Sequence, residues 1–371
     1  MGLVWYFSHK LNIRNDHDKS VLSCVKTWAF ISEDFYDLSG ESVKLSICIA
    51  TLNRAKYIGQ TLDSIVPQLT AESEVVIVDG ASIDNTSEVV NTYSAQHKNI
   101  RYFRLNKKGG VDADYCKTIE FARGEYCWLM SDDDLMDATA LSKVFQALDT
   151  APDLLLINSQ IKSIDFQVIL EERRLKIYND LEFGSEEFEH FFRTTANYLS
   201  FIGAVIIKRS IWLEREKEKY FGSCFIHMGV IFQKPFSGTI KVLSNPLIFI
   251  RNGNAQWTNR SFHIWMFKWP KLIWSFLSFS DEVKLQIVHK KPWTMFKKLI
   301  LLRALGRYTW SEFKFLIASE RFSIIGFVKA FVIVLVPICV LNTLAKFFYI
   351  YVRKDLVTAA DLSLAKSPNL N

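Results

Sequence analysis

The segment LSICIAT, residues 45–51, sets the fold class of this chain. It is a short apolar run with two isoleucines, and such a run is typical of a buried strand. An amphipathic pattern over residues 56–65 then predicts a helix, and residues 74–78 predict a second buried strand. The alternation continues, with strands expected at 100–105 and 126–130 and with helices expected at 84–93 and 112–123.

Strands that alternate regularly with helices indicate an α/β fold with a mostly parallel sheet and flanking helices. In such sheets, ligands bind beyond the carboxyl ends of the strands. Asp79 ends one predicted strand, and the run Asp132-Asp133-Asp134 follows another. The sequence therefore places carboxylates at one edge of the sheet. Past residue 150 the pattern weakens, with strands expected at 154–158 and 201–207 and helices at 185–195, 228–232 and through 261–320.

The acidic run 132–134 has the chemistry of a divalent metal site. Mg²⁺ and Mn²⁺ prefer oxygen ligands and commonly bind through one or two carboxylates together with substrate phosphates. A cation there would neutralise a departing diphosphate. The alternative is that Ser131 and the aspartates only cap the next helix. The position directly after a strand favours the metal site, provided that the carboxylates are not paired on the outside of the protein.

Two further polar elements lie at predicted strand ends. Asp79 can accept hydrogen bonds from a base or a ribose hydroxyl, although a plain turn residue is the alternative. The pair Gly109-Gly110 predicts a tight turn before a helix that starts with Asp112 and Asp114. The chain contains neither GxGxxG nor GxxxxGK[ST], so dinucleotide oxidoreductases and P-loop enzymes lose their main support.

Three segments together resemble the family-2 glycosyltransferases of GT-A fold. They are SICIATLNR at residues 46–54, VIVDGASID at 76–84 and ARGEYCWLMSDDD at 122–134. The stretches GGVDADY at 109–115 and RNGNAQW at 251–257 add a likeness to abequosyltransferase-like bacterial enzymes of surface-polysaccharide assembly. The resemblance implies a Rossmann-like GT-A sheet. It also implies an inverting transfer from a nucleotide-sugar donor, by a single displacement without a covalent sugar–enzyme intermediate.

Carried over by position, the resemblance implies donor contacts in the loops after the first strands. Thr51, Asn53 and Arg54 would lie near the nucleotide, and Asp79 would bind its base or ribose. We add Asp112, which opens the helix after the glycine pair, to this nucleotide-sugar-binding set.

The resemblance also implies that the acidic triplet is the metal-binding D-x-D element for Mn²⁺ or Mg²⁺. Ser131 stands where the family commonly has the first Asp, whereas Asp133 falls where a metal ligand is expected. Asp132 or Asp134 then takes the missing role. We predict metal ligands at Asp133 and Asp134 and a donor contact at Asp132.

An inverting transfer needs a base that takes the proton of the acceptor hydroxyl. In the family a carboxylate near a helix start fills this role, but residues 222–229 (GSCFIHMG) contain only a histidine. We predict His227 as the catalytic base, because imidazole titrates near neutral pH. The alternative is a buried histidine bonded to a backbone carbonyl. Glu186 and Glu187 are the substitutes.

The segment after residue 250 supplies candidate acceptor contacts. Arg251, Asn254 and Trp257 could face a phosphate or an acceptor, because Arg binds diphosphate oxygens and Trp stacks on sugar rings. The alternative is a surface loop with an anchoring aromatic residue.

From residue 258 onward the chain holds 17 Lys and Arg against 6 Asp and Glu. These basic residues are interleaved with aromatic and aliphatic stretches, which favours a lipid surface and not nucleic acid as partner. Residues 322–352 carry only Lys329 and Lys346 as charges. They predict a spanning helix, an interfacial helix or hairpin broken at Pro337, or a buried core helix. The membrane alternatives suit a lipid-linked saccharide acceptor.

We divide the chain into an N-terminal extension (1–43), a GT-A domain (44–257), a basic aromatic helical region (258–321), an apolar membrane-associating segment (322–354) and a tail (355–371). The N-terminus lacks a signal pattern, so we expect the cytoplasmic face of the cell membrane. Two other functions compete with transfer: a sugar nucleotidyltransferase, whose glycine-rich N-terminal loop is missing, and a non-catalytic saccharide- or membrane-binding protein.

Overall fold

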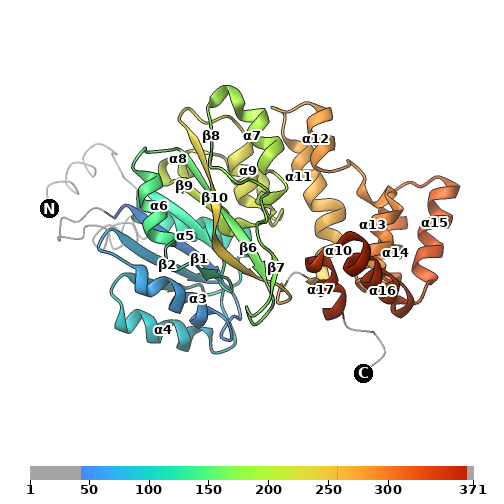
Figure 1. Cartoon of the computed structure of the whole chain (residues 1–371), viewed down its shortest axis with the longest axis horizontal. Helices are drawn as coiled ribbons and strands as arrows, with labels where there is room; N and C mark the ends of the chain where they lie inside the picture. Colours follow the sequence, from blue (N-terminus) through green and yellow to red (C-terminus); the bar gives the residue numbers. More distant parts are fainter. Residues whose placement is uncertain (1–42, 257, 366–371) are drawn as a thin grey trace, which may run out of the picture. The chain divides into compact units, whose positions relative to one another are not determined.

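The computed structural model describes residues 43–256 and 258–365 (Figure 1). The predicted N-terminal extension up to residue 42, the side chain of Trp257 and residues 366–371 lie outside the described residues.

The first part of the chain folds as its sequence predicts. Four strands pair in parallel in the order β3-β2-β1-β4. Helices α3, α4 and α5 connect them; α5 packs on β1 and β2, and α3 contacts α4. These elements are β1 (Leu45–Thr51), α3 (Ile58–Ile65), β2 (Ser73–Asp79), α4 (Thr86–Gln96), β3 (Ile100–Arg104), α5 (Val111–Phe121) and β4 (Tyr126–Met130). Strands β2 and β4 are buried along their whole length, which is why continuous apolar runs identified them.

Beyond β4 the sheet is mixed, which corrects the expectation of a mostly parallel sheet. Strand β9 (Val205–Lys208) lies antiparallel between β4 and β6 (Leu154–Lys162). The predicted strand at 201–207 starts only at Val205, after a 3₁₀ turn at Ile202–Ala204. Three short strands complete this part: β5 (Leu135–Met136) and β8 (Leu181–Phe183) pair with β10, and β7 (Ile169–Glu171) pairs with β6.

The longest strand, β10 (Ile240–Arg251), was missed by the sequence analysis. It runs parallel to β6, but its register shifts on both sides of Pro246. Proline removes a backbone donor, and the bulged residues break the alternation of buried and exposed positions. The strand matters because it delivers Arg251 to the edge where β4 ends.

The remaining helices divide between two hydrophobic cores. The core of the sheet extends through Val288 and includes residues of α11 and α12. A second core forms among α13, α14 and α15, together with Phe262 and Trp293. The helices are α6 (Ala140–Leu148), α7 (Phe188–Thr195), α8 (Arg209–Glu214), α9 (Ile226–Phe232), α10 (Ser261–His263), α11 (Trp269–Ser275), α12 (Asp281–Ile287), α13 (Phe296–Ala304), α14 (Trp310–Ser319), α15 (Ile324–Leu335), α16 (Ile338–Phe347) and α17 (Leu356–Leu364).

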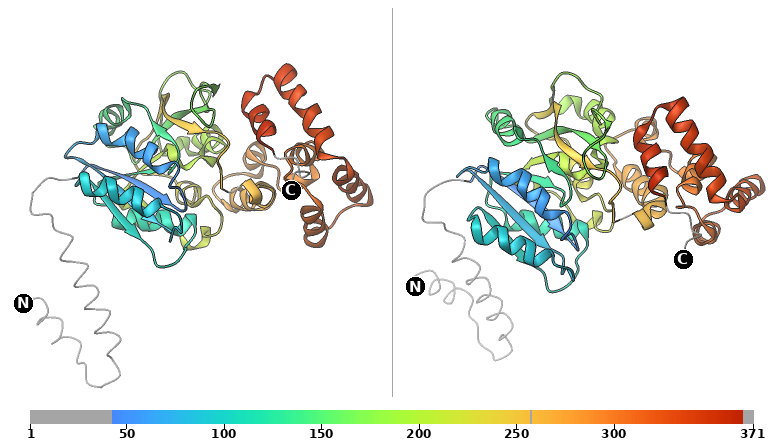
Figure 2. Two further views of the ribbon diagram at one scale, coloured as in Figure 1. Left: turned by 90° about the horizontal axis from the view of Figure 1, so that it is seen from below. Right: turned by 60° about the horizontal axis from the view of Figure 1, so that its bottom comes forward.

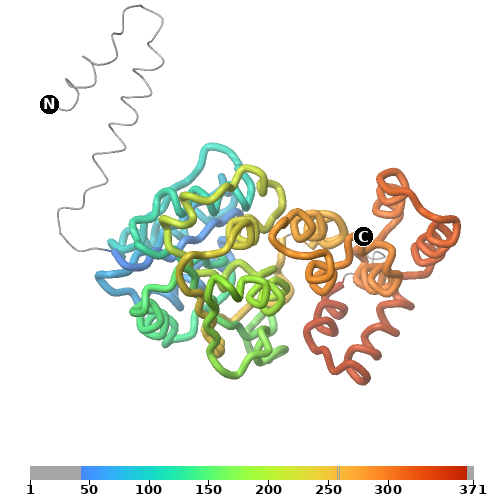
Figure 3. The backbone as a smooth tube through the Cα atoms, turned by 90° about the horizontal axis from the view of Figure 1, so that it is seen from above, coloured from blue at the N-terminus to red at the C-terminus, as the bar shows by residue number. Residues whose placement is uncertain are grey.

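From α10 to residue 365 the described chain forms helices joined by short loops (Figure 2). Helix α15 and the continuous pair of α16 with the π-helix η9 (Phe348–Arg353) are bent by 92° relative to each other. Within the described ranges, no single helix meets the length and hydropathy expected of a membrane span, whereas this bent pair meets them jointly. The chain then turns back through α17, shown in dark red in Figure 3.

Candidate active site

The loops after β1 and β2 are fastened to each other. Asn53 adopts a left-handed conformation, with φ of 54°, which asparagine tolerates better than most residues. Its backbone N–H donates to the Ser82 hydroxyl, and its side-chain oxygen accepts from the Ile83 N–H, both at 2.8 Å. The Arg54 N–H donates to the Thr86 hydroxyl at 2.8 Å. The predicted nucleotide-side residues therefore stand on a rigid double loop at the sheet edge.

Asp79 ends β2 and is completely buried. One carboxylate oxygen accepts from the Ser82 N–H and the other from the Tyr102 hydroxyl, each at 2.7 Å. Burial raises the pKa of Tyr102 to about 12, and the hydrogen bond to Asp79 adds to the shift. Arg104 Nε lies 4.0 Å from Asp79, and its side chain is half exposed. This arrangement fixes the Asp79 carboxyl group at the strand end, with the half-exposed Arg104 side chain beside it.

The acidic triplet directly follows β4, as predicted. Helix capping is excluded, because the next element is the short strand β5 and α6 starts only at Ala140. Arg54 forms ion pairs with Asp132 at 3.2 Å and with Asp133 at 2.9 Å. All three side chains are only 11 to 13% exposed. The pairs are therefore buried and do not lie on the outer surface.

The end of β10 closes the cluster from the other side. The Arg251 N–H donates to Asp134 at 2.8 Å, and its Nε donates to the Asp133 backbone carbonyl at 2.8 Å. The Asn254 side chain donates to the Asp133 carboxylate at 2.8 Å, while its carbonyl accepts from Arg54 at 3.1 Å. The structure thus brings Arg54, Arg251 and Asn254 together around the triplet, although they are far apart in the sequence.

Arg54 pairs with two of the three carboxylates, whereas Asp134 accepts from the backbone N–H of Arg251. Burial raises the pKa of Asp132 to about 7, the Asp133 charge adds to the shift, and Arg54 opposes it. Burial and the charge of Asp133 likewise raise the pKa of Asp134 to about 8. The pKa of Asp133 is also raised by burial, against the opposing effect of Arg54. Burial thus disfavours the charged forms of these carboxyl groups, and a bound cation would stabilise the charged forms.

The donor set fits a hard divalent cation, although no group of three or more His, Cys, Asp or Glu side chains converges on one point within the described ranges. Mg²⁺ and Mn²⁺ need only one or two carboxylates when substrate phosphates and waters complete the shell. Asp132 and Asp133 lie together beside the Arg54 guanidinium, whereas both carboxylate oxygens of the predicted ligand Asp134 accept hydrogen bonds, from the Ser131 hydroxyl and the Arg251 N–H. The metal roles of Asp133 and Asp134 stay predictions. The Thr51 hydroxyl is buried at the same strand edge, and its interaction with Asp132 opposes the rise in the pKa of that carboxyl group.

Asp112 and Asp114 start α5 behind the Gly109-Gly110 turn. The Asp112 carboxylate accepts from the backbone N–H groups of Cys224 at 3.0 Å and Ile226 at 3.1 Å, so it ties α5 to the start of α9. The Asp114 carboxylate lies between two glycines: a β-carbon would come within 2.8 Å of it at Gly80 and within 2.7 Å at Gly109. Burial raises the pKa of Asp114 to about 6. The donor role given to Asp112 stays a prediction.

His227 lies in the protein core and is 1% exposed. Its Nε2 forms a hydrogen bond of 2.6 Å with the Leu199 carbonyl, as the alternative interpretation of the sequence expected. Burial lowers the pKa of His227 to about 4, which leaves it a weak base. The substitutes Glu186 and Glu187 are exposed before α7. The role of His227 as base stays a prediction that its burial does not favour.

All three guanidinium nitrogens of Arg251 donate hydrogen bonds to the protein. Its terminal nitrogens donate to the Ile164 carbonyl at 2.7 Å and to Gln60 at 2.6 Å. Burial lowers the pKa of its guanidinium. Arg251 therefore supports the acidic cluster, and its predicted contact with an acceptor stays a prediction, as does that of Trp257.

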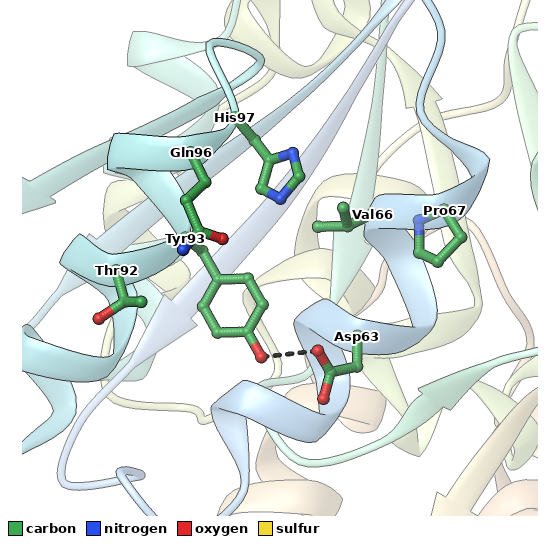
Figure 4. Close-up of a pocket in the computed structure, with 7 residues that line it drawn as sticks. All are labelled: Asp63, Val66, Pro67, Thr92, Tyr93, Gln96 and His97. Atoms are coloured by element: carbon green, nitrogen blue, oxygen red, sulfur yellow. Dashed lines mark hydrogen bonds between the residues drawn. The ribbon is translucent and has the colours of Figure 1, made fainter.

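A surface hollow lies away from this cluster, between α3 and α4 (Figure 4). It encloses about 310 Å³, and Asp63 and Tyr93 cross it with a hydrogen bond of 2.7 Å. None of the predicted site residues lines it, so we do not assign it to the candidate site.

Three residues of this edge were not predicted: Tyr102, Arg104 and Gln60. Arg104 ends β3 as Asp79 ends β2, and the two are direct partners in the strand register. The strand-end rule that selected Asp79 could therefore have selected Arg104. The contact of Gln60 with Arg251 has no signal in the sequence, because it depends on the position of β10.

The mixed sheet with its flanking helices, and the acidic run at the end of β4, fit the GT-A fold. Residues 46–209 match the family model "Glycosyl transferase family 2". This part of the chain is therefore similar to the family-2 glycosyltransferases.

Individual relatives agree with this class. An abequosyltransferase of Salmonella typhimurium, RfbV, is 24% identical over 230 residues, which cover 58% of this chain and 69% of the relative. The uncharacterized glycosyltransferase MG025 of Mycoplasma genitalium is 34% identical over 102 residues, which cover 27% of this chain and 34% of the relative. The chain thus spans about a third of that second relative.

Among solved structures, residues 1–349 of S. aureus TarS in complex with UDP superpose with a TM-score of 0.50. The two chains are 16% identical, and the match covers 86% of this chain and 90% of the other. At this identity the likeness establishes the fold.

Proposed function

We propose that the chain is an inverting glycosyltransferase that moves a sugar from a nucleotide-sugar donor to a lipid-linked saccharide during surface-polysaccharide synthesis. The observation that carries the proposal is the buried cluster of Asp132, Asp133 and Asp134 with Arg54 at the carboxyl edge of the sheet. Buried carboxylates are costly unless a partner or a ligand compensates them, so such a cluster marks a functional site.

Different residues at the carboxyl edge of the sheet are suited to bind different parts of the donor. The double loop of Asn53 and Ser82 forms a rigid wall beside Asp79, whose position suits the base or the ribose. Arg54 and Arg104 are the cations available to diphosphate oxygens at this edge. Asp133, held by Asn254, is the best placed carboxylate for a cation. A bound Mn²⁺ or Mg²⁺ would stabilise the negative charge of the leaving nucleoside diphosphate.

The acceptor is the second part of the proposal, and an exposed apolar surface supports it. We name apolar surface the exposed large side chains of α15, α16 and η9: Ile324, Ile325, Phe327, Val328, Phe331, Val332, Leu335, Val340, Leu344, Phe347, Phe348, Ile350, Tyr351 and Val352. Exposed large apolar side chains that gather on consecutive helices often mark an interaction site. A chain that docks on a membrane would keep this surface out of water and meet an acceptor carried by a lipid.

The charges around the apolar surface favour an anionic lipid leaflet. Between Arg321 and Lys354 the sequence contains five basic residues and no acidic one. Lys329 lies over the Phe296 ring at 4.7 Å, with its ammonium close to the apolar face. Cations that border an apolar helix face strengthen binding to anionic headgroups. We therefore place the enzyme on the cytoplasmic side of the cell membrane.

We propose that α15 docks in the plane of the leaflet. Its Ala330, Ile333 and Val334 are buried in the second core, whereas Val328 and Val332 on the same helix are about half exposed. One face of the helix is thus already used by the protein, and the other is available to acyl chains. Insertion in the plane retains this packing.

The test of the reaction is donor hydrolysis and transfer by the full chain. A panel of UDP-, GDP-, CDP- and dTDP-sugars is assayed with Mn²⁺, for the wild type and for Asp133→Asn. We expect slow hydrolysis of one donor class by the wild type and a loss of at least about 10³-fold in Asp133→Asn. Asp149→Asn, an exposed aspartate at the end of α6, is the matched control and should retain activity.

Two other functions would give different results in that assay. A non-catalytic saccharide-binding protein would bind a donor or a saccharide without any hydrolysis. A sugar nucleotidyltransferase would release pyrophosphate from a nucleoside triphosphate and a sugar phosphate. Either result would overturn the proposed transfer, and so would equal donor affinity in Asp133→Asn and the wild type.

A further inference from the structure

The segment 251–256 covers the acidic cluster and depends on a support outside the sheet. Arg251 and Asn254 hold Asp133 and Asp134, as described above. The Gln256 side chain donates to the carbonyl of Leu52 at 2.7 Å, in the loop that carries Arg54. The N–H of Asn252 donates to the Lys162 carbonyl at 2.9 Å. The position of this short segment therefore sets the geometry of the cluster.

The support is α17, more than 100 residues further along the chain. A β-carbon built on Gly253 would lie 2.4 Å from Leu364 Cδ1, so the leucine side chain packs directly over this glycine. Gly253 also has φ of 100°, a conformation that favours glycine. Helix α17 contacts β7, which pairs with β6 next to the same segment. Figure 1 shows α17 beside the end of β10.

Helix α17 is itself held by the C-terminal helices. Asp355 caps its N-terminus by accepting from the Thr358 N–H at 2.9 Å. The Asn342 side chain on α16 donates to the Leu362 carbonyl at 2.8 Å and to the Ala304 carbonyl at 3.0 Å. Arg307 lies 3.6 Å from Asp361. Displacement of α16 would therefore be transmitted to α17.

We propose that α17 is a positioning element for the acidic site, with Leu364 as its contact residue, and that lipid docking of the apolar surface is thereby coupled to donor binding. The coupling rests on the proposed function, because it requires both a donor and a lipid surface. Its path is continuous: the apolar surface ends at Val352, α17 starts at Leu356, and Leu364 reaches Gly253.

The expected sign of the coupling is positive. When the apolar surface binds lipid, α15 and α16 lose conformational freedom. Helix α17 is hydrogen-bonded to α16, so it loses conformational freedom as well. The segment 251–256 is then already ordered when the donor arrives, so donor binding costs less conformational entropy. Linkage requires that the donor in turn strengthens lipid binding by the same factor.

The first test needs no membrane and compares Leu364→Ala with Leu285→Ala in the detergent-solubilised full chain. The control leucine lies on α12 and is 52% exposed, against 49% for Leu364. We expect kcat/KM for donor hydrolysis to fall about tenfold in Leu364→Ala only. Hydrogen exchange at the Arg251 and Asn252 amides should accelerate, while exchange in β1 stays unchanged. Unchanged exchange and kinetics in Leu364→Ala would overturn the positioning role.

The second test measures coupling by titrating the nucleoside diphosphate of the active donor, with Mn²⁺, in detergent and on vesicles with anionic lipid. We expect vesicles to tighten binding about fivefold or more in the wild type and less than twofold in Leu364→Ala. A wild type that docks and turns over donor with equal affinity in both media would overturn the coupling and leave the proposed function intact. A wild type that neither docks nor binds a nucleotide would overturn both.

Discussion

The acidic site and the apolar surface depart from ordinary burial in opposite directions. At the end of β4 the protein buries three carboxylates and two guanidinium groups, whereas on α15 and α16 it exposes isoleucine, valine and phenylalanine to water. Each arrangement is unfavourable for an isolated chain in water. The two regions therefore call for different partners. A bound cation would stabilise the acidic site, and contact with hydrocarbon would stabilise the apolar surface.

We expect the largest effect from the removal of Arg54, which pairs with two carboxylates of the acidic site. Arg54→Ala removes the ion-pair partner that the loop after β1 supplies to Asp132 and Asp133, and the loss of one partner of a buried pair costs about 3–5 kcal/mol of unfolding free energy. We expect a marked fall in Tm and a loss of about 10²- to 10³-fold in kcat/KM. Mn²⁺ should raise the Tm of this variant more than that of the wild type, because a cation replaces the missing charge.

Arg193→Ala is the control for that experiment, since Arg193 is exposed and forms an ion pair with Glu189 on the same helix, α7. It should change the free energy of unfolding by less than about 0.5 kcal/mol. Wild-type stability and turnover in Arg54→Ala would show that the acidic site does not depend on this guanidinium.

The other side of the comparison is tested by charges on the apolar surface. In Val328→Asp/Val332→Asp two half-exposed valines of α15 become acidic. Burial of a valine side chain contributes about 1.5 kcal/mol or more, so affinity for anionic vesicles should fall roughly 50-fold or more. Vesicle co-sedimentation measures it. Leu277→Asp is the control, because Leu277 is 95% exposed outside this surface. Equal loss in both variants would contradict a specific docking face.

The two regions also differ in how much their sequences predicted. Strands β1, β2 and β4 were found because uninterrupted buried runs have a clear pattern, and the strand-end rule then gave Asp79 and the triplet. Strand β10 was missed because Pro246 and the bulges around it break the pattern. The pairing of Asn254 with Asp133 could not be predicted as a contact, because it depends on where β10 joins the sheet.

In the C-terminal part the sequence predicted apolar character but not its geometry. The run 322–352 left three alternatives open, since hydropathy does not distinguish a buried helix from an exposed one. The structure shows α15 with one face in the second core and the other exposed. Nor could any local pattern predict that Leu364 packs on Gly253.

A pH experiment tests whether His227 is a structural residue of the core or the catalytic base. Its folded pKa of about 4 lies below the ordinary value of about 6.5, so the unfolded chain binds the proton more tightly. Stability is therefore lost as pH falls from about 6.5 towards 4. The contribution amounts to about 2 kcal/mol between pH 7 and pH 5.

His227→Gln should remove this pH dependence from the free energy of unfolding, measured by urea denaturation at several pH values. His190→Gln, a change at an exposed histidine of α7, should leave the slope as in the wild type. If His227 were the base, the acid limb of the pH–rate profile of kcat would also disappear in His227→Gln, and kcat itself would fall steeply.

The smallest effect is expected from a substitution of Glu186, whose side chain is exposed before α7, as is usual for a glutamate. Glu186→Gln should therefore change neither kcat nor its pH profile beyond about twofold, since exposed carboxylates away from a cleft contribute little. A loss of 10²-fold or more, with unchanged donor affinity, would identify an acid–base residue outside the cluster. It would also show that the catalytic centre extends beyond the carboxyl edge of the sheet. Our assignment of the centre to that edge rests on the buried acidic cluster.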